Sequence, residues 1–159
     1  MAQIYLSLGS NIQRKKNIHS ALKHLQQTFG KLNISAIYET AAVGFEGDPF
    51  FNLAVGLNTT LTPQQVATSL KVIEDKHLRI RNNVKFSTRT LDIDLLLYDQ
   101  YILHPEMDIP RNEITRYAFV LFPLAEIAAD VIHPQYNKTI AELAETSTLD
   151  SSLLKQVFL

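Results

Sequence analysis

Apolar and polar residues alternate in four short stretches of this chain, and a period of two residues is typical of a half-buried β-strand. The stretches occupy residues 4–8, 32–38, 51–57 and 91–97. Two longer segments, residues 18–29 and 63–79, instead place apolar side chains three and four positions apart, as an amphipathic helix does. The order strand–helix–strand–strand–helix–strand predicts an α+β fold on the ferredoxin-like, split βαβ plan. Its sheet is mainly antiparallel and both helices lie on one face, so the other face is available for a site.

Signals at the helix ends support these two helices. Gly30 follows the first helical segment and is typical of a C-cap. Thr62 is a predicted N-cap, Pro63 suits the first helical position, and Gln65 completes a capping box. We therefore expect the second helix to begin at Pro63 and to run to about Arg79.

The rest of the chain follows less regular patterns. Residues 40–49 contain two glycines and a proline and are predicted to form a loop with a functional role. The strand at 91–97 is expected to form a hairpin with residues 101–103. Residues 117–127 read as a buried helix interrupted at Pro123. The chain after about Asp130 is expected to be a weakly organised C-terminal extension.

Length and charge narrow the class of protein. The 159 residues suit one domain spanning 1–159, and the 46% hydrophobic content is enough for an ordinary core. The chain has no cysteine, which excludes disulfides and thiolate metal sites. A net charge of −1 gives no general attraction to nucleic acid, and no apolar run is long enough for a membrane span. We expect a cytoplasmic monomer that acts on small molecules.

Asp92 and Asp94 are the most informative polar residues. They alternate with Leu91 and Ile93, so both carboxylates point to one face of the strand, about 7 Å apart. Mg²⁺ takes one or two carboxylates and keeps its other positions for water and phosphate. Arg89 lies three residues before Asp92 and could meet the same phosphates. The pattern suggests phosphoryl-type transfer from a metal–nucleotide complex, and the alternative is a solvated strand edge with an incidental arginine.

Other residues could contribute to such a site. Cationic side chains are concentrated in residues 79–89, where guanidinium groups could bind phosphate or could simply be solvated. The amide of Asn52 could pair with the edge of a heteroaromatic ring, or Asn52 could be an ordinary strand residue. Four phenylalanines could stack on a flat ring, although core positions are the simpler explanation; they are Phe45, Phe50, Phe86 and Phe119.

The chain lacks the two common nucleotide-binding motifs. It has neither a G-x-x-x-x-G-K-[ST] loop nor G-x-G-x-x-G. The five histidines show no metal-ligand spacing, so we expect them to be surface or ordinary core residues.

Taken together, these pieces resemble the 6-hydroxymethyl-7,8-dihydropterin pyrophosphokinase family of the folate pathway. The resemblance extends from Ile4 to about Ala128, and its most specific part is R-x-x-D-x-D. In chain order the matching pieces are Leu8-Gly9-Ser10-Asn11, Tyr38-Glu39-Thr40, Phe50-Phe51-Asn52, Ile73-Glu74 followed by Arg79 and Arg81, Arg89-Thr90-Leu91-Asp92-Ile93-Asp94, and Ala118-Phe119-Val120-Leu121-Phe122-Pro123-Leu124.

The resemblance implies an activity and a role for each matching residue. The family transfers pyrophosphate from ATP to the pterin hydroxymethyl oxygen and releases AMP. By resemblance, Asp92 and Asp94 hold two Mg²⁺ ions, and Arg79 and Arg89 neutralise charge on the transferred group. The implied pterin residues are Thr40, Val43, Asn52, Phe86 and Phe119. The implied nucleotide residues are Glu74, Arg81 and Arg111.

The chain also departs from the family pattern. Ser87-Thr88 stands where the family usually has Gly-Pro, Ala41 where it has Pro, Arg111 where it has a phosphate-binding His, and Tyr117 where it has Arg. These changes affect nucleotide contacts more than the fold. They leave open a non-catalytic relative that binds pterin or nucleotide, whereas an RNA-binding role is disfavoured by the near-neutral charge.

Overall fold

The computed structural model describes residues 1–77 and 90–159. In this part of the chain the main sheet has six strands in the order β5-β1-β4-β3-β8, and β2 also pairs with β4. All of these pairings are antiparallel, as the split βαβ plan requires. The strands are β1 (Ala2–Ser10), β2 (Asn33–Ile34), β3 (Ile37–Thr40), β4 (Phe50–Thr59), β5 (Asp92–Tyr98) and β8 (Lys155–Val157).

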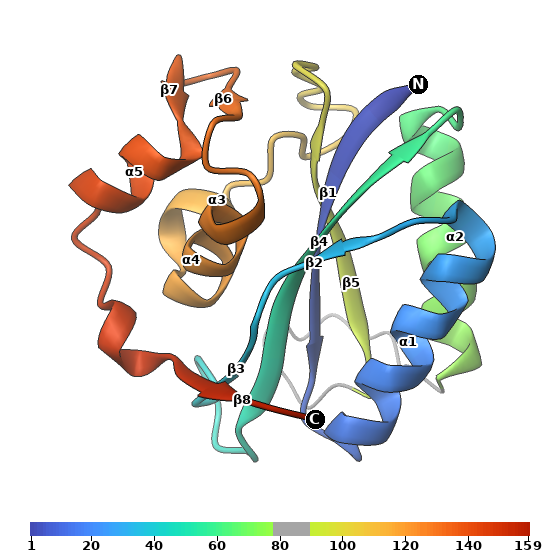
Figure 1. Cartoon of the computed structure of the whole chain (residues 1–159), viewed down its shortest axis with the longest axis vertical. Helices are drawn as coiled ribbons and strands as arrows, with labels where there is room; N and C mark the ends of the chain where they lie inside the picture. The colour runs from blue at the N-terminus through green and yellow to red at the C-terminus, as the bar shows by residue number, and fades with distance from the viewer. Residues whose placement is uncertain (78–89) are drawn as a thin grey trace.

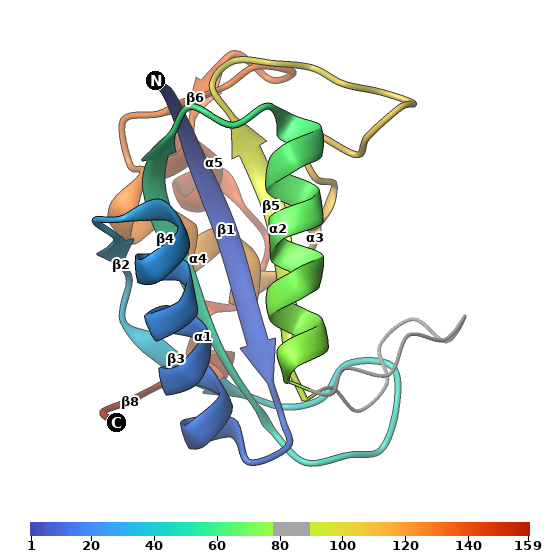
Figure 2. The same ribbon diagram turned by 90° about the vertical axis from the view of Figure 1, so that its right-hand side faces the viewer.

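Helices cover both faces of the sheet (Figure 1). Figure 2 looks onto the face covered by α1 (Arg14–Phe29) and α2 (Pro63–Lys76), which lie together there as predicted. The opposite face packs against the C-terminal third of the chain, so it is not free along its whole length. The elements of that third are α3 (Glu113–Arg116), α4 (Ala118–Ile127), β6 (Ile132–His133), β7 (Lys138–Thr139), α5 (Ile140–Thr146) and the 3-10 turn η1 (Ser151–Leu153).

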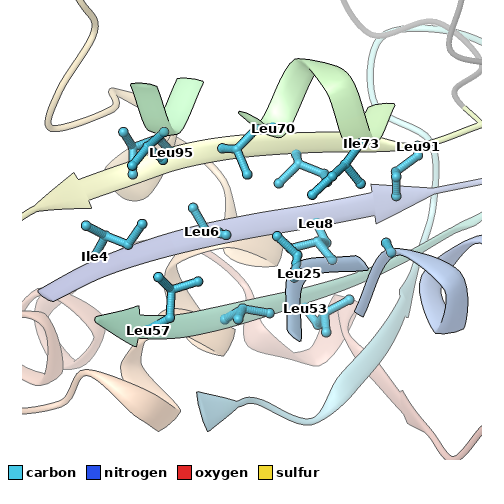
Figure 3. Close-up of a cluster of buried hydrophobic side chains, with 14 of the residues drawn as sticks. Ile4, Leu6, Leu8, Leu25, Leu53, Leu57, Leu70, Ile73, Leu91 and Leu95 are labelled. Carbon is cyan, nitrogen blue, oxygen red and sulfur yellow. The ribbon is translucent and has the colours of Figure 1, made fainter. Parts of the chain in front are cut away.

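The larger core lies between the sheet and helices α1 and α2 (Figure 3). Ile4, Leu6 and Leu8 of β1 are fully buried there, and each such side chain contributes about 1.5–3 kcal/mol when removed from water. A second cluster on the opposite face joins the sheet to α4 and includes Leu121 and Leu124. The central strands of the sheet are therefore packed on both faces, one against each core.

The predicted helix ends are confirmed. Gly30 caps α1 with φ of 87°, a conformation that L side chains rarely adopt, and its N–H bonds the carbonyl of Gln26. In α2, the Thr62 hydroxyl accepts from the Gln65 N–H while the Gln65 side chain accepts from the Thr62 N–H. The last described helical residue is Lys76, so the predicted end at Arg79 lies outside the described residues.

Two strand predictions are wrong in detail. The stretch at 32–38 is divided between β2 and β3, because the Ser35 hydroxyl interrupts the ladder by accepting from the Ala54 N–H at 2.8 Å.

In the described chain, residues 101–103 do not pair with β5. Asp99 has φ of 45° and its carboxylate accepts from the Gln3 N–H at 2.7 Å. The turn after β5 is therefore hydrogen-bonded to β1. Leu103 forms an isolated bridge with Ile109 instead of pairing with β5.

The predictions for the C-terminal third are also corrected. Pro123 lies inside α4 and does not interrupt it. The lost hydrogen bond costs about 3 kcal/mol, and the burial of Val120, Leu121 and Leu124 offsets that cost.

The chain after Asp130 is well organised instead of a loose extension. A second capping box, formed by Thr139 and Glu142, begins α5. Strand β8 then extends the main sheet by pairing with β3.

No helix within residues 1–77 and 90–159 combines the length and the apolar character needed to cross a membrane.

Candidate functional site

The predicted site residues gather at one end of the sheet. Strand pairing places Gly9 of β1 opposite Asp92 of β5 on one side and opposite Asn52 of β4 on the other. Tyr38 of β3 pairs with Asn52, so the row continues across four strands. In Figures 1 and 2 the loop that joins β3 to β4, drawn in cyan, lies at this same end. The row brings together carboxylate and amide groups that are far apart in the sequence.

Asp92 and Asp94 project from the sheet face opposite α1 and α2. Leu91, Ile93 and Leu95 alternate with the two aspartates and belong to the core under α1 and α2. Because successive side chains of a strand point to opposite faces, the two carboxylates point to the other face of the sheet. Burial, and next the charge of Asp92, raise the pKa of Asp94, although Arg111 acts to lower it. Negative charge is therefore costly at Asp94, and a cation there would offset the cost.

This carboxylate pair fits a hard divalent ion. Mg²⁺ prefers oxygen ligands and takes few of them from protein. Among the described residues, no group of three or more His, Cys, Asp or Glu side chains could hold a metal by itself. That water and phosphate fill the other positions of the ion stays a prediction from the sequence.

Asn52 is held in one orientation by its neighbours. It is 5% exposed, and its amide nitrogen donates to the Thr40 hydroxyl at 2.6 Å. Its amide oxygen lies over Gly9, where a Cβ would approach to 2.8 Å. Gly9 lies within β1, and its lack of a side chain leaves room for this amide. Thr40 and Asn52, both predicted to contact the pterin, are thus in direct contact with each other.

Glu74 and Arg111 line the same cavity beside the outer edge of β5. Glu74 ends the buried face of α2, and its carboxylate accepts from the Ile93 N–H at 2.9 Å, between the two aspartates. An Arg111 nitrogen lies 3.7 Å from an Asp94 oxygen, and its Nε lies 2.8 Å from a Glu113 oxygen. A cavity of about 130 Å³ separates α2 from the segment before α3, and its lining includes Leu70, Lys71, Glu74, Asp94, Met107 and Arg111.

The Arg111 guanidinium is kept charged in this position. Burial acts to lower the pKa of Arg111, but the charges of Asp94 and Glu113 outweigh burial and raise it. A permanent cation therefore lies beside one carboxylate of the predicted metal pair.

The other predicted site residues that the structure describes are Val43 and Phe119. Val43 is exposed, in the loop between β3 and β4. Phe119 lies in the first turn of α4, and its ring stacks on Tyr117 with centroids 5.2 Å apart. Tyr117 is one of the departures from the family pattern, so an aromatic contact occupies the place where the family usually has a cation. Arg79, Arg81, Phe86 and Arg89 lie outside the described residues.

The turn between β1 and α1 belongs to this site, although it was treated only as part of a motif. The Ser10 hydroxyl donates to the Thr90 carbonyl at 2.6 Å, directly before the aspartate strand. The Asn11 amide donates to the Asp48 carbonyl at 3.1 Å, at the end of the loop between β3 and β4. The Gly-Ser-Asn motif is the sequence signal, but the segments that it anchors are distant in sequence.

Comparison with known families and proteins agrees with this geometry. Residues 5–129 match the family model described as 7,8-dihydro-6-hydroxymethylpterin-pyrophosphokinase (HPPK). A 2-amino-4-hydroxy-6-hydroxymethyldihydropteridine pyrophosphokinase of Aquifex aeolicus is 36% identical over 152 residues, covering 94% of each chain. The enzyme of that name from Porphyromonas gingivalis is 37% identical over 142 residues, covering 85% of this chain and 96% of its own.

Solved structures share the fold at low sequence identity. A Plasmodium falciparum HPPK-DHPS structure with pterin and p-hydroxybenzoate superposes with a TM-score of 0.75 at 16% identity. The match covers 99% of this chain and 47% of the Plasmodium chain, so this chain spans about half of that protein.

Proposed function

The chain belongs to the 7,8-dihydro-6-hydroxymethylpterin-pyrophosphokinase family, and from this premise we propose that it transfers pyrophosphate from Mg-ATP to 6-hydroxymethyl-7,8-dihydropterin, releasing AMP. The observation that carries the proposal is the row formed by Asp92, Gly9 and Asn52. It places a candidate metal-binding carboxylate and an amide that could read a ring edge on one face of three adjacent strands. An acceptor hydroxyl bound between them would lie close to the phosphates.

Asp92 and Asp94 are the proposed metal ligands, and we propose two Mg²⁺ ions. Mg²⁺ bound there would supply positive charge to the phosphate oxygens of ATP and to the acceptor hydroxyl. The protein's part is to hold both carboxylates on one strand of the sheet. Strand β5 is fixed by its ladder with β1 and by the bond from the Ile93 N–H to Glu74.

We propose that the nucleotide binds along the outer edge of β5. Glu74 and Arg111 line the cavity there together with Asp94, and Arg81 would add a further cation. A guanidinium can offer two parallel donors to phosphate oxygens. Arg79 and Arg89 are the proposed catalytic cations, because they would neutralise negative charge on the transferred pyrophosphoryl group.

The pterin is proposed to bind over Asn52. The contact between Asn52 and Thr40 fixes the amide before any substrate arrives, which reduces the ordering cost of binding. The backbone from Thr40 to Val43 would read the edge of the ring together with Asn52. Phe86 and Phe119 would provide aromatic faces, which bind flat heterocycles by stacking.

An assay of AMP release tests the function directly. The purified chain is supplied with Mg-ATP, with and without 6-hydroxymethyl-7,8-dihydropterin, and AMP and the pyrophosphorylated pterin are quantified. We expect AMP in equal amount to the new pterin product, and only when both substrates and Mg²⁺ are present. Pterin binding without AMP formation would refute the enzyme and leave a binding module.

A further inference from the structure

One side chain of α1 contacts both ends of the loop between β3 and β4, residues 41–49. The guanidinium of Arg14 lies 2.7 Å from the carboxylate of Glu39, which lies in β3 two residues before the loop begins. A second nitrogen of the same group donates to the Pro49 carbonyl at 3.1 Å, at the end of the loop. The group also lies over the Phe51 ring, 3.9 Å from its centroid, well within cation–π range.

These contacts lie on the reverse side of the proposed pterin site. Glu39 and Phe51 are a cross-strand pair, next to the pair formed by Thr40 and Phe50. Phe51 belongs to the core under α1 and α2, whereas Asn52 projects to the other face. Arg14 therefore does not face the proposed substrate, and it can act on that site only through the backbone of β3 and β4.

The loop has few other contacts that would define its path. Residues 41–49 are exposed apart from Ala42 and Phe45, which are half-buried. Gly44 has φ of 82°, so a flexible residue lies near the middle of the loop. A segment with so little buried surface depends on anchors at its two ends. The Thr40–Phe50 pair closes the loop through the backbone, and the Asn11 bond to the Asp48 carbonyl holds its second end. Arg14 adds a side-chain link between the segments at the two ends.

We propose that Arg14 is a positioning residue for the pterin, acting as a clamp that fixes the two ends of loop 41–49 and thereby the placement of Thr40 and Phe50. The inference rests on the proposed function. A planar guanidinium suits this task because it presents donors in several directions at once and remains charged. A lysine would keep the charge but would not reach Glu39 and the Pro49 carbonyl with one rigid group.

Two measurements on the Arg14→Ala variant test the clamp. Hydrogen exchange in the ligand-free protein reports on the loop amides, and we expect those of residues 41–49 to exchange faster. Calorimetry with a saturating non-hydrolysable ATP analogue and Mg²⁺ reports on the pterin, and we expect its Kd to rise about tenfold, as loss of a charge-assisted contact predicts. The Kd of the analogue itself should stay within about twofold, because Arg14 contacts β3 and β4, which β1 separates from β5.

Matched variants separate positioning from general stability. Lys15→Ala removes a neighbouring exposed cation of the same helix and should change neither readout. Arg14→Lys should give an intermediate pterin Kd, and Arg14→Ala combined with Glu39→Ala should be less harmful than the sum of the two single changes. Unchanged loop exchange, an unchanged pterin Kd, or equal weakening of pterin and nucleotide would each overturn the clamp. Absence of AMP release by the parent protein would instead overturn the proposed function, because loop exchange does not depend on catalysis.

Discussion

Asp94 lies among several charged side chains of the described site. Asp92 lies two residues away on the same strand face, and the Arg111 guanidinium lies 3.7 Å from an Asp94 oxygen. The pKa of Asp94 is raised, first by burial and then by the charge of Asp92. A carboxylate with a raised pKa is less stable when ionised in the folded protein than in the unfolded chain. This penalty is tolerable if the residue is needed to bind a cation.

Replacing Asp94 by Asn should separate function from folding. We expect Asp94→Asn to lower AMP release by about a hundredfold or more, since removal of a metal ligand withdraws several kcal/mol of charge stabilisation. Without Mg²⁺ at pH 8, the free energy of unfolding should be equal to or above that of the parent, because a costly negative charge is gone. Urea titrations and AMP assays measure both effects. The exposed Asp130→Asn is the control, and an unfolded Asp94→Asn protein would contradict the prediction.

Arg111 replaces the histidine of the family pattern and keeps a cation at the edge of β5. Arg111→Ala should weaken binding of a non-hydrolysable Mg-ATP analogue by about 1–3 kcal/mol, the range for a hydrogen bond to a charged group. Calorimetry at saturating Mg²⁺ measures this difference. The exposed Arg116→Ala should leave the Kd unchanged. Identical affinities for Arg111→Ala and the parent would remove Arg111 from the nucleotide site.

At the scale of elements, the small hairpin of β6 and β7 contains a buried titratable side chain, His133. His133 is 1% exposed, and its Nδ1 accepts from the Gln135 N–H at 3.2 Å. Burial lowers the pKa of His133. The folded protein therefore disfavours the protonated ring, while the unfolded chain takes up a proton near the ordinary value of 6.5. The contribution of the neutral His133 ring to stability is therefore complete above this ordinary value. It is lost as the pH falls from there toward the lowered pKa of the folded protein.

The His133→Asn variant should lack this part of the pH dependence. Asn can keep an acceptor near the position of Nδ1 but does not titrate. Urea unfolding from pH 8 to pH 5 should show the parent losing more stability on acidification than the variant. Near pH 8 the variant should be somewhat less stable, because the smaller side chain packs less well. If the free energy of unfolding falls equally in both proteins between pH 8 and pH 5, His133 does not cause the loss of stability at acid pH.

At the scale of the whole molecule, the last strand completes the sheet next to the proposed pterin strand. Strand β8 pairs with β3, and Val157 and Leu159 pack against the core under α1 and α2. The Tyr38 hydroxyl also bonds the Glu126 carboxylate of α4, which ties β3 to the second core. Strand β3, which ends at Thr40, is therefore supported by segments from the far end of the chain.

Deletion of residues 155–159 should show this dependence. Loss of the β3–β8 ladder and of two partly buried apolar side chains should lower the free energy of unfolding by about 2 kcal/mol or more. Pterin affinity should fall more than nucleotide affinity, because β5 lies at the opposite edge of the sheet. Denaturant unfolding and calorimetry measure these effects. Phe158→Ala, at a side chain that is 87% exposed, should cost less than about 0.5 kcal/mol. A deletion variant as stable as the parent would show that β8 adds nothing to the sheet.

Local patterns in the sequence were sufficient for the elements and for part of the site. Alternation identified the four main strand regions and put Asp92 and Asp94 on one face, because strand geometry depends only on neighbours along the chain. For the same reason, Gly30 marked the end of α1 and Thr62 marked the beginning of α2. The motif order also identified the family before any contact was known.

Tertiary structure alone decided which distant residues meet. Strand register places the Asn52 amide over Gly9, and it is not encoded in either strand alone. Strand β8 was missed because three residues carry too little pattern, and it forms because the β3 edge and the core accept it. The contacts of Arg14 with both ends of loop 41–49 likewise require α1 to pack beside β4. Periodicity reports how each segment buries its own side chains, whereas register and anchoring depend on the free energy of packing all segments together.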